Sequence, residues 1–548
     1  MTRYFLVNNA SLAATYGIGT HLRHLVECLT TIGDIEIVYI DLQCDTSSCQ
    51  TQKDEKGYWH LQIPTVSMGM EDGVYNRNVY AEVVRWNESQ KETARIIFHF
   101  HYEQHFLLAS LLKAHYPSSQ ILYTIHYQAW AFQLLGDRKQ LQKSLMMLPS
   151  EEISDKEYER CQQIQTLVTI EKRMLSIADE VIVLSRFTQD ILIEYYKISP
   201  SKLHFIPNAI ADTHDAIDFS LDPTKQYILY VGRLDKGKGL DLLIAAFRQI
   251  HTSFPNTRLI VVGNGDYDAF FSEAKELWPH ISWTGRLEAT ELQQLYQSVQ
   301  VGVQPSFNEQ CSYTIIEMLM NGLPVVGTDC SGVKEMIIHA PQLQVAFDAH
   351  RNDREQMIKL LTAVIKDLLS DPRRLKEESV KARKAYEERY TTEHATLRWH
   401  ELLALPPRSI TENTDLLLLI DQRCIDIINQ RPDYMDLEFF GLTGISHYIW
   451  WRMQQLDVQE YESRKQCALL GEHLIYAIDW MFELALEECT FTEDYGNPAL
   501  CTLCTSLLQA SFYPTKIEQL QQMLVSEPSA IVTAKDVIIN VLKVCNYK

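Results

Sequence analysis

The chain has 548 residues, of which 46% are apolar and 22% charged, a balance typical of a globular protein with roughly three or four domains. Its formal net charge of −21 argues against nucleic-acid binding and against docking on anionic lipid through a broad basic face. No apolar run approaches the about 20 residues that span a bilayer, and the N-terminus begins a strand without a secretory-signal pattern. We therefore expect a cytoplasmic protein without a transmembrane segment.

Twelve cysteines are scattered without the spacing of a disulfide framework, which suits a reducing compartment. One Cys-x-x-Cys pair, Cys501 and Cys504, lies in an apolar helical pattern, with no second pair and no histidine at ligand spacing. Buried thiols and zinc ligands are both open for this pair, and the first interpretation is favoured.

The first structural unit is predicted to begin with a strand at residues 4–7, a loop that contains Gly17 and Gly19, and a helix at residues 20–31. A glycine loop between a strand and a helix N-terminus directs backbone N–H groups at one point and can bind an anion. A tight structural turn is the alternative. A second strand is predicted at residues 38–41, followed by a loop at residues 43–57.

Histidines gather at the ends of the next two predicted strands. Residues 96–101 place His99 and His101 on one face, and residues 121–126 place His126 at a carboxyl end, where ligand sites of parallel sheets lie. The His-x-His pair could bind a metal, but no carboxylate partner is evident, so histidines that face a cleft are the favoured interpretation. For His126, a hydrogen-bonded position in the core is the alternative.

The rest of this unit is predicted to contain a mobile insertion near the cleft at residues 137–155 and its last strand at residues 181–185. Residues 206–208 are predicted to form the hinge into the second unit.

The second unit is predicted to open with a strand at residues 227–231 and a helix at residues 240–251, joined by a turn that carries Arg233 and Lys238. Two cations at a strand-to-helix turn can bind one pyrophosphate, arginine through its planar fork and lysine as a point charge. A basic glycine turn is the alternative.

Two short turns follow. The strand predicted at residues 259–262 ends at Gly263, in a tight loop on the cleft side. The turn at residues 283–287 contains Arg286 and Leu287.

Two acids, Glu309 and Glu317, lie eight positions apart between predicted strands at residues 299–303 and 325–327. Glu309 is in a loop, and Glu317 is on a short helix that ends near Gly322. The residues between the acids should present backbone N–H groups at a helix N-terminus, where the helix dipole adds partial positive charge: Gln310, Cys311, Ser312, Tyr313 and Thr314. A carboxylate can accept two sugar hydroxyls, so this arrangement favours a phosphorylated sugar ligand. By spacing alone, a capping acid and a solvated helical acid are the favoured interpretation, and the surrounding sequence reverses that preference.

The stretch at residues 305–324 resembles the acid–seven residues–acid motif of the retaining nucleotide-sugar glycosyltransferases of family 4. Pro305 and Ser306 before the first acid and the segment 317–326 agree with that motif. The resemblance implies the GT-B fold, an α/β architecture of two facing Rossmann-like domains with a cleft between them. The family usually has Gly-Phe-Gly after the first acid, where this chain has Gln310, Cys311 and Ser312, and the loss of both glycines restricts the backbone.

The resemblance also implies roles for individual residues. Glu309 and His126 would orient the donor sugar, Glu317 would hold the donor ribose, and Arg233 and Lys238 would bind the donor diphosphate. Other positions would approach the donor through backbone groups: Gly17, Gly19, Gly263, Arg286, Leu287, Gln310, Cys311, Ser312, Tyr313 and Thr314. No cofactor or metal is expected, because no Asp-x-Asp motif lies where a metal would hold the diphosphate and the two cations take its place.

Three domains are predicted: an acceptor-side Rossmann-like domain at residues 1–206, a donor-binding Rossmann-like domain with crossover helices at residues 207–405, and an all-α accessory domain at residues 408–548. Pro406 and Pro407 break the chain before the accessory domain. This domain could form a homodimer or bind a partner.

The leading prediction is a metal-independent glycosyltransferase that moves a sugar, with retention, from a nucleotide-diphospho-sugar to a hydroxyl of a glycan, lipid-linked or peptide acceptor. The peptide is included because the whole chain is similar to glycosyltransferases encoded beside small peptide precursors in Bacteroidetes-type bacteria. The alternative is a non-catalytic nucleotide-sugar-binding scaffold that docks a partner through its helical tail. A phosphorylase would need a pyridoxal-lysine motif, and none is seen.

Overall fold

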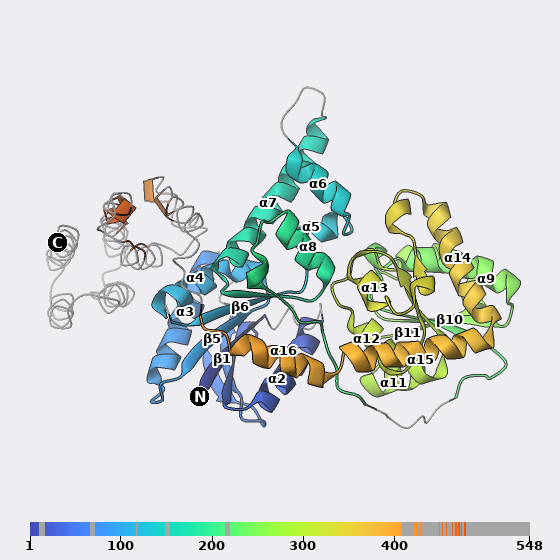
Figure 1. The fold of residues 1–548 in the computed structure, drawn as a ribbon, viewed down its shortest axis with the longest axis horizontal. Helices are drawn as coiled ribbons and strands as arrows, with labels where there is room; N and C mark the ends of the chain where they lie inside the picture. The colour runs from blue at the N-terminus through green and yellow to red at the C-terminus, as the bar shows by residue number, and fades with distance from the viewer. Residues whose placement is uncertain are drawn as a thin grey trace.

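A computed structural model describes residues 1–9, 17–65, 72–116, 118–147, 154–213 and 220–407, together with scattered positions between 421 and 477. The described residues up to 407 form two α/β domains that lie side by side (Figure 1). The predicted accessory domain at residues 408–548 lies outside the described residues, as do Cys501 and Cys504, except for the scattered positions. Among those, Cys424, Ile425 and Leu470 are buried in the same apolar cluster as the N-terminal domain.

The N-terminal domain is built on an eight-stranded sheet in the order β3-β4-β2-β1-β5-β6-β7-β8. Its strands are β1 Thr2–Asn9, β2 Ile35–Cys44, β3 Gln50–Lys53, β4 Trp59–Pro64, β5 Arg95–Phe100, β6 Gln120–Ile125, β7 Glu180–Val183 and β8 Leu203–Phe205. Neighbouring strands are parallel, except for the antiparallel pair β3 and β4 at one edge.

Two strand predictions for this domain are wrong. The loop expected at residues 43–57 contains β3, whose four residues are all exposed and polar, so it carries no alternating apolar signal. The strand at residues 181–185 is not the last, because β8 pairs with β7 beyond it. β8 has only three residues, too few to show a period.

Helices cover both faces of this sheet. They are α2 Ile18–Ile32, α3 Asp72–Ser89, α4 Phe106–His115, α5 Ala129–Gln133, α6 Arg138–Met146, α7 Asp155–Ile177 and α8 Arg186–Glu194. The segment predicted as a mobile insertion instead contains α6, which Asp137 caps by accepting from the backbone N–H groups of Lys139 and Gln140. Leu141 anchors α6 in the apolar core, while residues 148–153 lie outside the described residues.

The C-terminal domain has a six-stranded, wholly parallel sheet in the order β11-β10-β9-β12-β13-β14. Its strands are β9 Gln226–Val231, β10 Thr257–Val262, β11 Ile281–Gly285, β12 Val301–Gln304, β13 Val325–Thr328 and β14 Gln344–Val345. Its helices are α9 Leu240–Ser253, α10 Asp268–Ala274, α11 Ala289–Ser298, α12 Tyr313–Met320, α13 Ser331–Met336, α14 Arg354–Ser370 and α15 Pro372–Arg389. The strand order changes direction at β9, and ligands of such sheets bind at that point, beyond the carboxyl ends of the strands.

Helix α16 (Thr392–Leu403) leaves the C-terminal domain and packs against α2 of the N-terminal domain, as predicted (Figure 1). Trp399 and Leu402 of α16 are buried in one apolar cluster with Leu22 and Leu25 of α2. The guanidinium of Arg95 donates hydrogen bonds to the carbonyl oxygens of Leu403 and Leu405, at 2.6 and 2.7 Å. The last helix of the two-domain unit thus completes the first domain.

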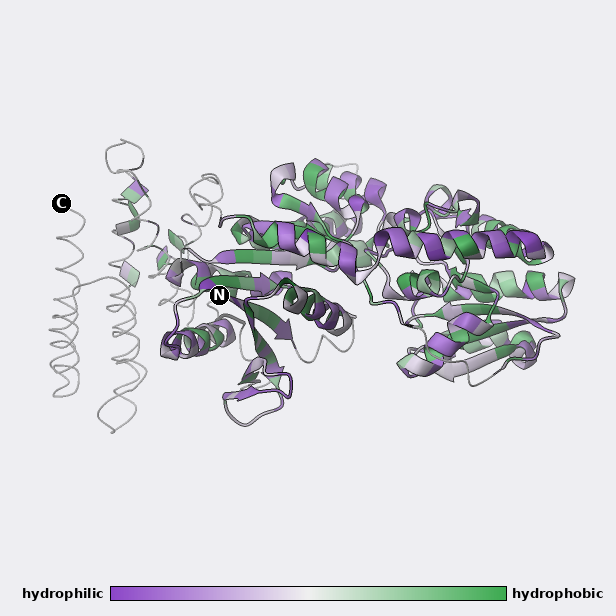
Figure 2. Ribbon diagram, turned by 60° about the horizontal axis from the view of Figure 1, so that its bottom comes forward, coloured by the Kyte–Doolittle hydropathy of each residue, from purple (hydrophilic) through white to green (hydrophobic). Residues whose placement is uncertain are grey.

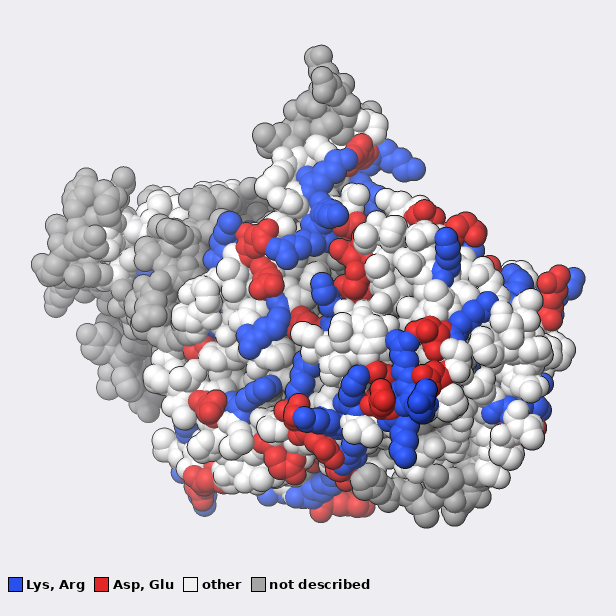
Figure 3. Space-filling model, turned by 45° about the vertical axis from the view of Figure 1, so that its right-hand side comes forward, with Lys and Arg blue, Asp and Glu red and all other residues white. Residues whose placement is uncertain are grey.

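Apolar residues concentrate in the strands of both sheets, and the helices turn polar faces outward (Figure 2). β6, for example, is buried at each of its six positions, as expected for a strand covered on both faces. Lys and Arg are interspersed with Asp and Glu on the face seen in Figure 3. Within the described ranges, no helix is both long enough and apolar enough to cross a membrane.

Candidate active site

A cavity of about 450 Å³ lies between the two domains, at the carboxyl ends of both sheets. From the N-terminal domain it is lined by Gly17, His126 and Tyr127 among others. The C-terminal domain contributes most of the predicted donor residues: Arg233, Lys238, Glu309, Gln310, Cys311, Ser312, Tyr313 and Thr314. The fold therefore brings residues from distant parts of the chain into one cavity.

The turn at residues 232–239 presents two cations to the cavity. The carboxylate of Asp235 holds its shape, because Oδ1 accepts from the backbone N–H of Lys238 at 3.1 Å and Oδ2 lies 3.2 Å from Nη2 of Arg233. Gly239 ends the turn at φ +69°, and a Cβ there would lie 2.2 Å from the carbonyl oxygen of Pro305. Only glycine fits that close approach, which fixes the turn against the strand end before Glu309. The Arg233 side chain is 44% exposed, so its guanidinium is accessible.

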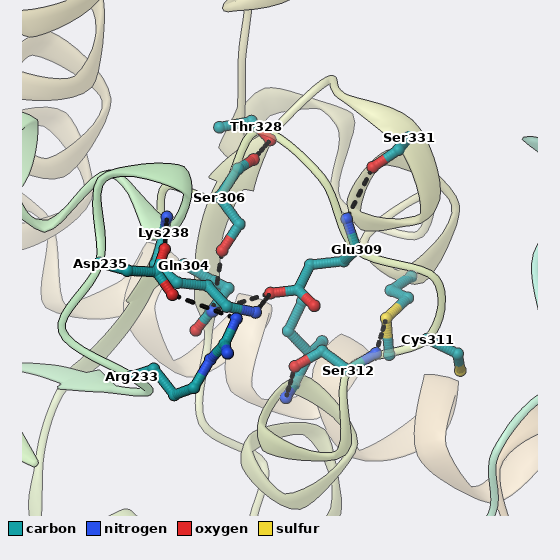
Figure 4. A network of polar contacts seen from close by, with 12 residues as sticks. Arg233, Asp235, Lys238, Gln304, Ser306, Glu309, Cys311, Ser312, Thr328 and Ser331 are labelled. Carbon is teal, nitrogen blue, oxygen red and sulfur yellow. Dashed lines mark hydrogen bonds and ion pairs between the residues drawn. The ribbon is translucent and has the colours of Figure 1, made fainter. Parts of the chain in front are cut away.

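An ion pair links the turn at residues 232–239 to the loop that carries Glu309. Nζ of Lys238 lies 2.5 Å from Oε1 of Glu309, and the amide of Gln304 approaches the same oxygen at 3.5 Å (Figure 4). The Gln304 amide also donates to Oγ of Ser306 at 3.0 Å. The lysine that the resemblance assigns to the diphosphate and the acid that it assigns to the sugar are therefore direct neighbours.

The loop that carries Glu309 is clamped against the start of α13. The backbone N–H of Glu309 donates to Oγ of Ser331 at 2.9 Å, and its carbonyl accepts from the N–H of Gly332 at 2.9 Å (Figure 4). A Cβ on Gly332 would lie 2.0 Å from the carbonyl oxygen of Gln310. This contact explains how the loop keeps its course without the two glycines that the family usually has after the first acid.

The side chain of Gln310 is directed to the other domain. It is 7% exposed, and its Oε1 accepts from Oγ of Ser185 at 3.0 Å and from the hydroxyl of Thr188. The next residue is tied to the hinge between the domains, because Nδ2 of Asn208 donates to the carbonyl of Cys311 at 2.6 Å. Gln310, which stands where the family usually has glycine, thus connects the two domains.

Cys311 is buried, and that burial raises the pKa of its thiol to about 12. The thiolate form, which is the nucleophile, is therefore disfavoured.

Helix α12 points its N-terminus at the cavity. Ser312 caps it, since Oγ accepts from the backbone N–H of Ile315 at 3.4 Å. Tyr313 and Thr314, in the first turn, line the cavity. Their orphan N–H groups and the helix dipole favour an anion there.

Glu317 lies one turn further along α12 and does not line the 450 Å³ cavity. The hydroxyl of Tyr296 donates to its Oε2 at 2.7 Å, and burial raises the pKa of the carboxyl above its usual range. The carboxylate is thus held in a fixed orientation beside the cavity.

Four other predicted residues are also placed outside that cavity. Gly263 follows β10, and Arg286 and Leu287 follow β11. Gly19, in the first turn of α2, lines a separate pocket of about 500 Å³ with Tyr39, Asp41 and His60 among its neighbours. The structure therefore separates Gly17 from Gly19, which the sequence pattern had grouped together.

Three histidines of the N-terminal domain, His21, His101 and His126, lie together at the cavity, which His126 lines, and we call them the histidine wall. Nδ1 of His101 lies 3.0 Å from Nε2 of His126, and the rings of His21 and His126 meet edge to face at 4.6 Å. Sequence analysis singled out His101 and His126 but missed His21. A histidine on the buried face of an amphipathic helix carries no signal of its neighbours.

Two family models match the chain: "Glycosyltransferase Family 4" over residues 15–214 and "Glycosyl transferases group 1" over residues 213–383. The sulfoquinovosyl transferase of Arabidopsis thaliana is 28% identical over 177 residues, which are 32% of this chain and 33% of that protein. The D-inositol 3-phosphate glycosyltransferase of Segniliparus rotundus is 26% identical over 222 residues, 38% of this chain and 48% of that protein. The chain thus spans a third to a half of the length of these relatives.

Solved structures share the whole two-domain arrangement. Sucrose-phosphate synthase of Thermosynechococcus elongatus matches with a TM-score of 0.57 and 18% identity, over 74% of this chain and 98% of that one. HepE of Anabaena, solved with UDP and glucose, matches with a TM-score of 0.51 and 14% identity, over 74% of this chain and all (100%) of that one. With the two family models adjoining at residues 213–214, and two parallel-sheet domains facing one cavity, the chain belongs to glycosyltransferase family 4 and has the GT-B fold.

Proposed function

We propose that the protein transfers a sugar from a nucleotide-diphospho-sugar to an acceptor hydroxyl, with retention of the anomeric configuration. The observation that carries the proposal is the convergence of Arg233, Lys238 and the N-terminus of α12 on one cavity between the domains. These groups supply two positive charges and a set of backbone donors at one place, which is what a diphosphate requires.

The reaction breaks the bond between the anomeric carbon and the diphosphate oxygen and forms a bond from that carbon to the acceptor oxygen. The acceptor proton passes to the departing phosphate, so no protein nucleophile is needed. Negative charge grows on the leaving diphosphate, and Arg233, Lys238 and the N–H groups of Tyr313 and Thr314 are placed to stabilise it. Because two side-chain cations serve the diphosphate, we propose that it needs no metal ion.

Glu309 and His126 are placed to orient the sugar from opposite sides of the cavity. Donor binding would draw Lys238 from Glu309 to the phosphate and leave the Glu309 carboxylate for sugar hydroxyls. Glu317, held by Tyr296, would accept the ribose hydroxyls. Among the relatives, HepE was solved with UDP and glucose and two others are named for transferring a sugar group, which supports a nucleotide-sugar donor here.

The test is a screen of UDP-, GDP- and ADP-sugars for thermal stabilisation and for slow hydrolysis, on the full chain. We expect one donor to raise the melting temperature and to be hydrolysed, and both effects to be lost in Arg233→Ala and Glu317→Ala. Arg373→Ala is the matched control, because that side chain is 93% exposed on α15. If no nucleotide sugar changes the melting temperature, the proposed donor site is wrong; binding without hydrolysis, with or without an acceptor, would point to a scaffold instead.

A further inference from the structure

The histidine wall has the arrangement of a metal site, and the sugar transfer proposed above gives a role to His126 but none to His21 and His101. One ring nitrogen from each of His21, His101 and His126 lies within 4.8 Å of the other two. In a tetrahedral zinc site, nitrogen ligands at about 2.0–2.1 Å from the ion lie about 3.3 Å apart. Nδ1 of His101 and Nε2 of His126 lie 3.0 Å apart, at hydrogen-bond distance, so an ion bound there would replace the proton between them.

An unpartnered, buried nitrogen marks His21 as an available ligand. His21 is 6% exposed and its Nε2 atom has no hydrogen-bond partner, whereas Nδ1 of His101 lies at hydrogen-bond distance from Nε2 of His126. The adjacent His99 shows the contrast, because Tyr4 and Thr124 bond both of its nitrogens, at 2.9 and 2.7 Å. His105 also leaves both nitrogens unpartnered, but it belongs to no group of three potential ligands within the described ranges.

The second nitrogen of His21 is held in the way that metal-binding histidines are held. Its Nδ1 lies 3.0 Å from Oδ1 of Asn208, so an N–H on Nδ1 donates to that oxygen and leaves Nε2 with a lone pair. A lone pair on a neutral imidazole nitrogen is what coordinates a metal.

We propose that His21, His101 and His126 bind one borderline divalent transition-metal ion of the zinc class on the N-terminal side of the cleft. Three imidazoles without a carboxylate suit zinc, cobalt or copper and disfavour magnesium and calcium, which prefer oxygen ligands. His126 is the least buried of the three and lines the cavity. The fourth coordination position therefore opens toward the cleft, where water or an acceptor oxygen can take it.

This ion would be separate from the diphosphate site, which is formed by the C-terminal domain. The absence of a carboxylate beside the His-x-His pair had counted against a metal in the sequence. His21, on helix α2, supplies a third nitrogen ligand, so a carboxylate is not needed to complete the site. The proposal does not depend on which donor the protein uses or on whether it transfers sugar.

The experiment titrates tag-free, chelator-treated full-length protein with Co²⁺ and follows the visible absorption of the bound ion. Cys501→Ser/Cys504→Ser is the background, so that this cysteine pair cannot contribute. We expect one equivalent of Co²⁺ with the spectrum of a four-coordinate site, displaced by Zn²⁺ and not by Mg²⁺. X-ray absorption of the zinc-loaded form should show nitrogen ligands at about 2.0–2.1 Å and no sulfur at about 2.3 Å.

Variants separate ligation from packing. His101→Gln and His21→Gln should abolish binding, and Asn208→Ala should weaken it about 10- to 100-fold, as loss of a histidine's hydrogen-bond partner does at metal sites. His24→Gln is the matched control on α2, because His24 is paired with Glu27 and lies outside the wall. The proposal is overturned if the wild-type background binds no stoichiometric Co²⁺, if sulfur ligands appear, or if folded His101→Gln and His21→Gln bind as before. The wild-type titration and absorption spectrum decide the matter even if a variant fails to fold.

Discussion

The two domains face the cavity with chemically different surfaces. The C-terminal domain presents charge: two cations at the turn 232–239, a carboxylate at Glu309, and the N-terminus of α12. The N-terminal domain presents His126, whose ring lies against those of the buried His21 and His101. Both surfaces lie at the carboxyl ends of parallel strands, so the same architecture can carry charged groups in one domain and imidazole rings in the other. The comparison teaches that the fold supplies the position of a site, whereas the residues at strand ends decide its chemistry.

The difference fits the two halves of the proposed reaction. A leaving diphosphate carries and gains negative charge, so its side requires cations. The acceptor hydroxyl and the sugar are neutral, and the imidazoles of the histidine wall, when no ion is bound to them, can meet these groups without attracting the diphosphate. A substitution on one surface can therefore be tested while the residues of the other surface are left unchanged.

The largest effect is expected on the charged surface. Arg233→Ala and Lys238→Ala should each lower kcat for donor hydrolysis about 10²- to 10³-fold, since each removes a group that stabilises charge on the leaving phosphate. Steady-state kinetics with the donor found in the screen measure this, with Arg373→Ala as the control. Equal rates in the variants and the control would contradict the assignment of these cations to the diphosphate.

A second effect is expected at the junction between the domains. Gln310→Ala should lower the free energy of unfolding by about 1–3 kcal/mol, because it leaves the buried hydroxyl of Thr188 without its Gln310 acceptor and leaves Ser185 to donate to Thr188. Urea unfolding measures the change. Gln189→Ala is the control, because Gln189 lies on α8 with Thr188 and its side chain makes an exposed contact with Arg186. A loss no larger than that of the control would mean that Gln310 does not join the domains.

A pH dependence is expected from the interior of the N-terminal domain. Glu171 accepts hydrogen bonds from the backbone N–H of Ala129 and the hydroxyl of Tyr196, and burial raises the pKa of its carboxyl from 4.5 to about 8. Between these values the folded state binds more protons than the unfolded state. Stability from this group is therefore complete below pH 4.5 and is lost as the pH rises to about 8.

The slope from this one group is at most about 1.4 kcal/mol per pH unit. Glu171→Gln should remove that part of the slope in urea unfolding measured from pH 5 to pH 8. The pH dependence of the free energy of unfolding that comes from other groups should not change. An unchanged profile would show that Glu171 titrates normally in the folded protein.

The smallest effect is expected at the ribose position. Tyr296→Phe removes the hydrogen bond to Glu317, and we expect donor affinity to fall by up to about tenfold, the value of one hydrogen bond of about 0.5–1.5 kcal/mol. Isothermal titration with the donor measures it, and kcat should be nearly unchanged because the tyrosine does not face the phosphate. A loss in kcat as large as that of Arg233→Ala would contradict this placement.

Sequence patterns predicted the charged surface much better than the histidine wall. Arg233, Lys238 and Glu309 follow strands with strong apolar periods and lie within one domain, so local spacing was enough to bring them together. The histidine wall joins His21 of α2 to the residues that directly follow β5 and β6, and only the tertiary arrangement shows that His21 is a neighbour of His126. Gln310 was interpreted through its backbone, yet its partners Ser185 and Thr188 lie in another domain.

Helix α16 also constrains how the protein can be made. Because Trp399 and Leu402 complete the apolar cluster around α2, the N-terminal domain cannot finish folding on the ribosome until residues beyond 403 have emerged. The whole second domain is synthesised in the interval, so the two domains mature together rather than in succession. For the same reason, a fragment cut at the hinge near residue 206 would expose the α2 face that α16 covers.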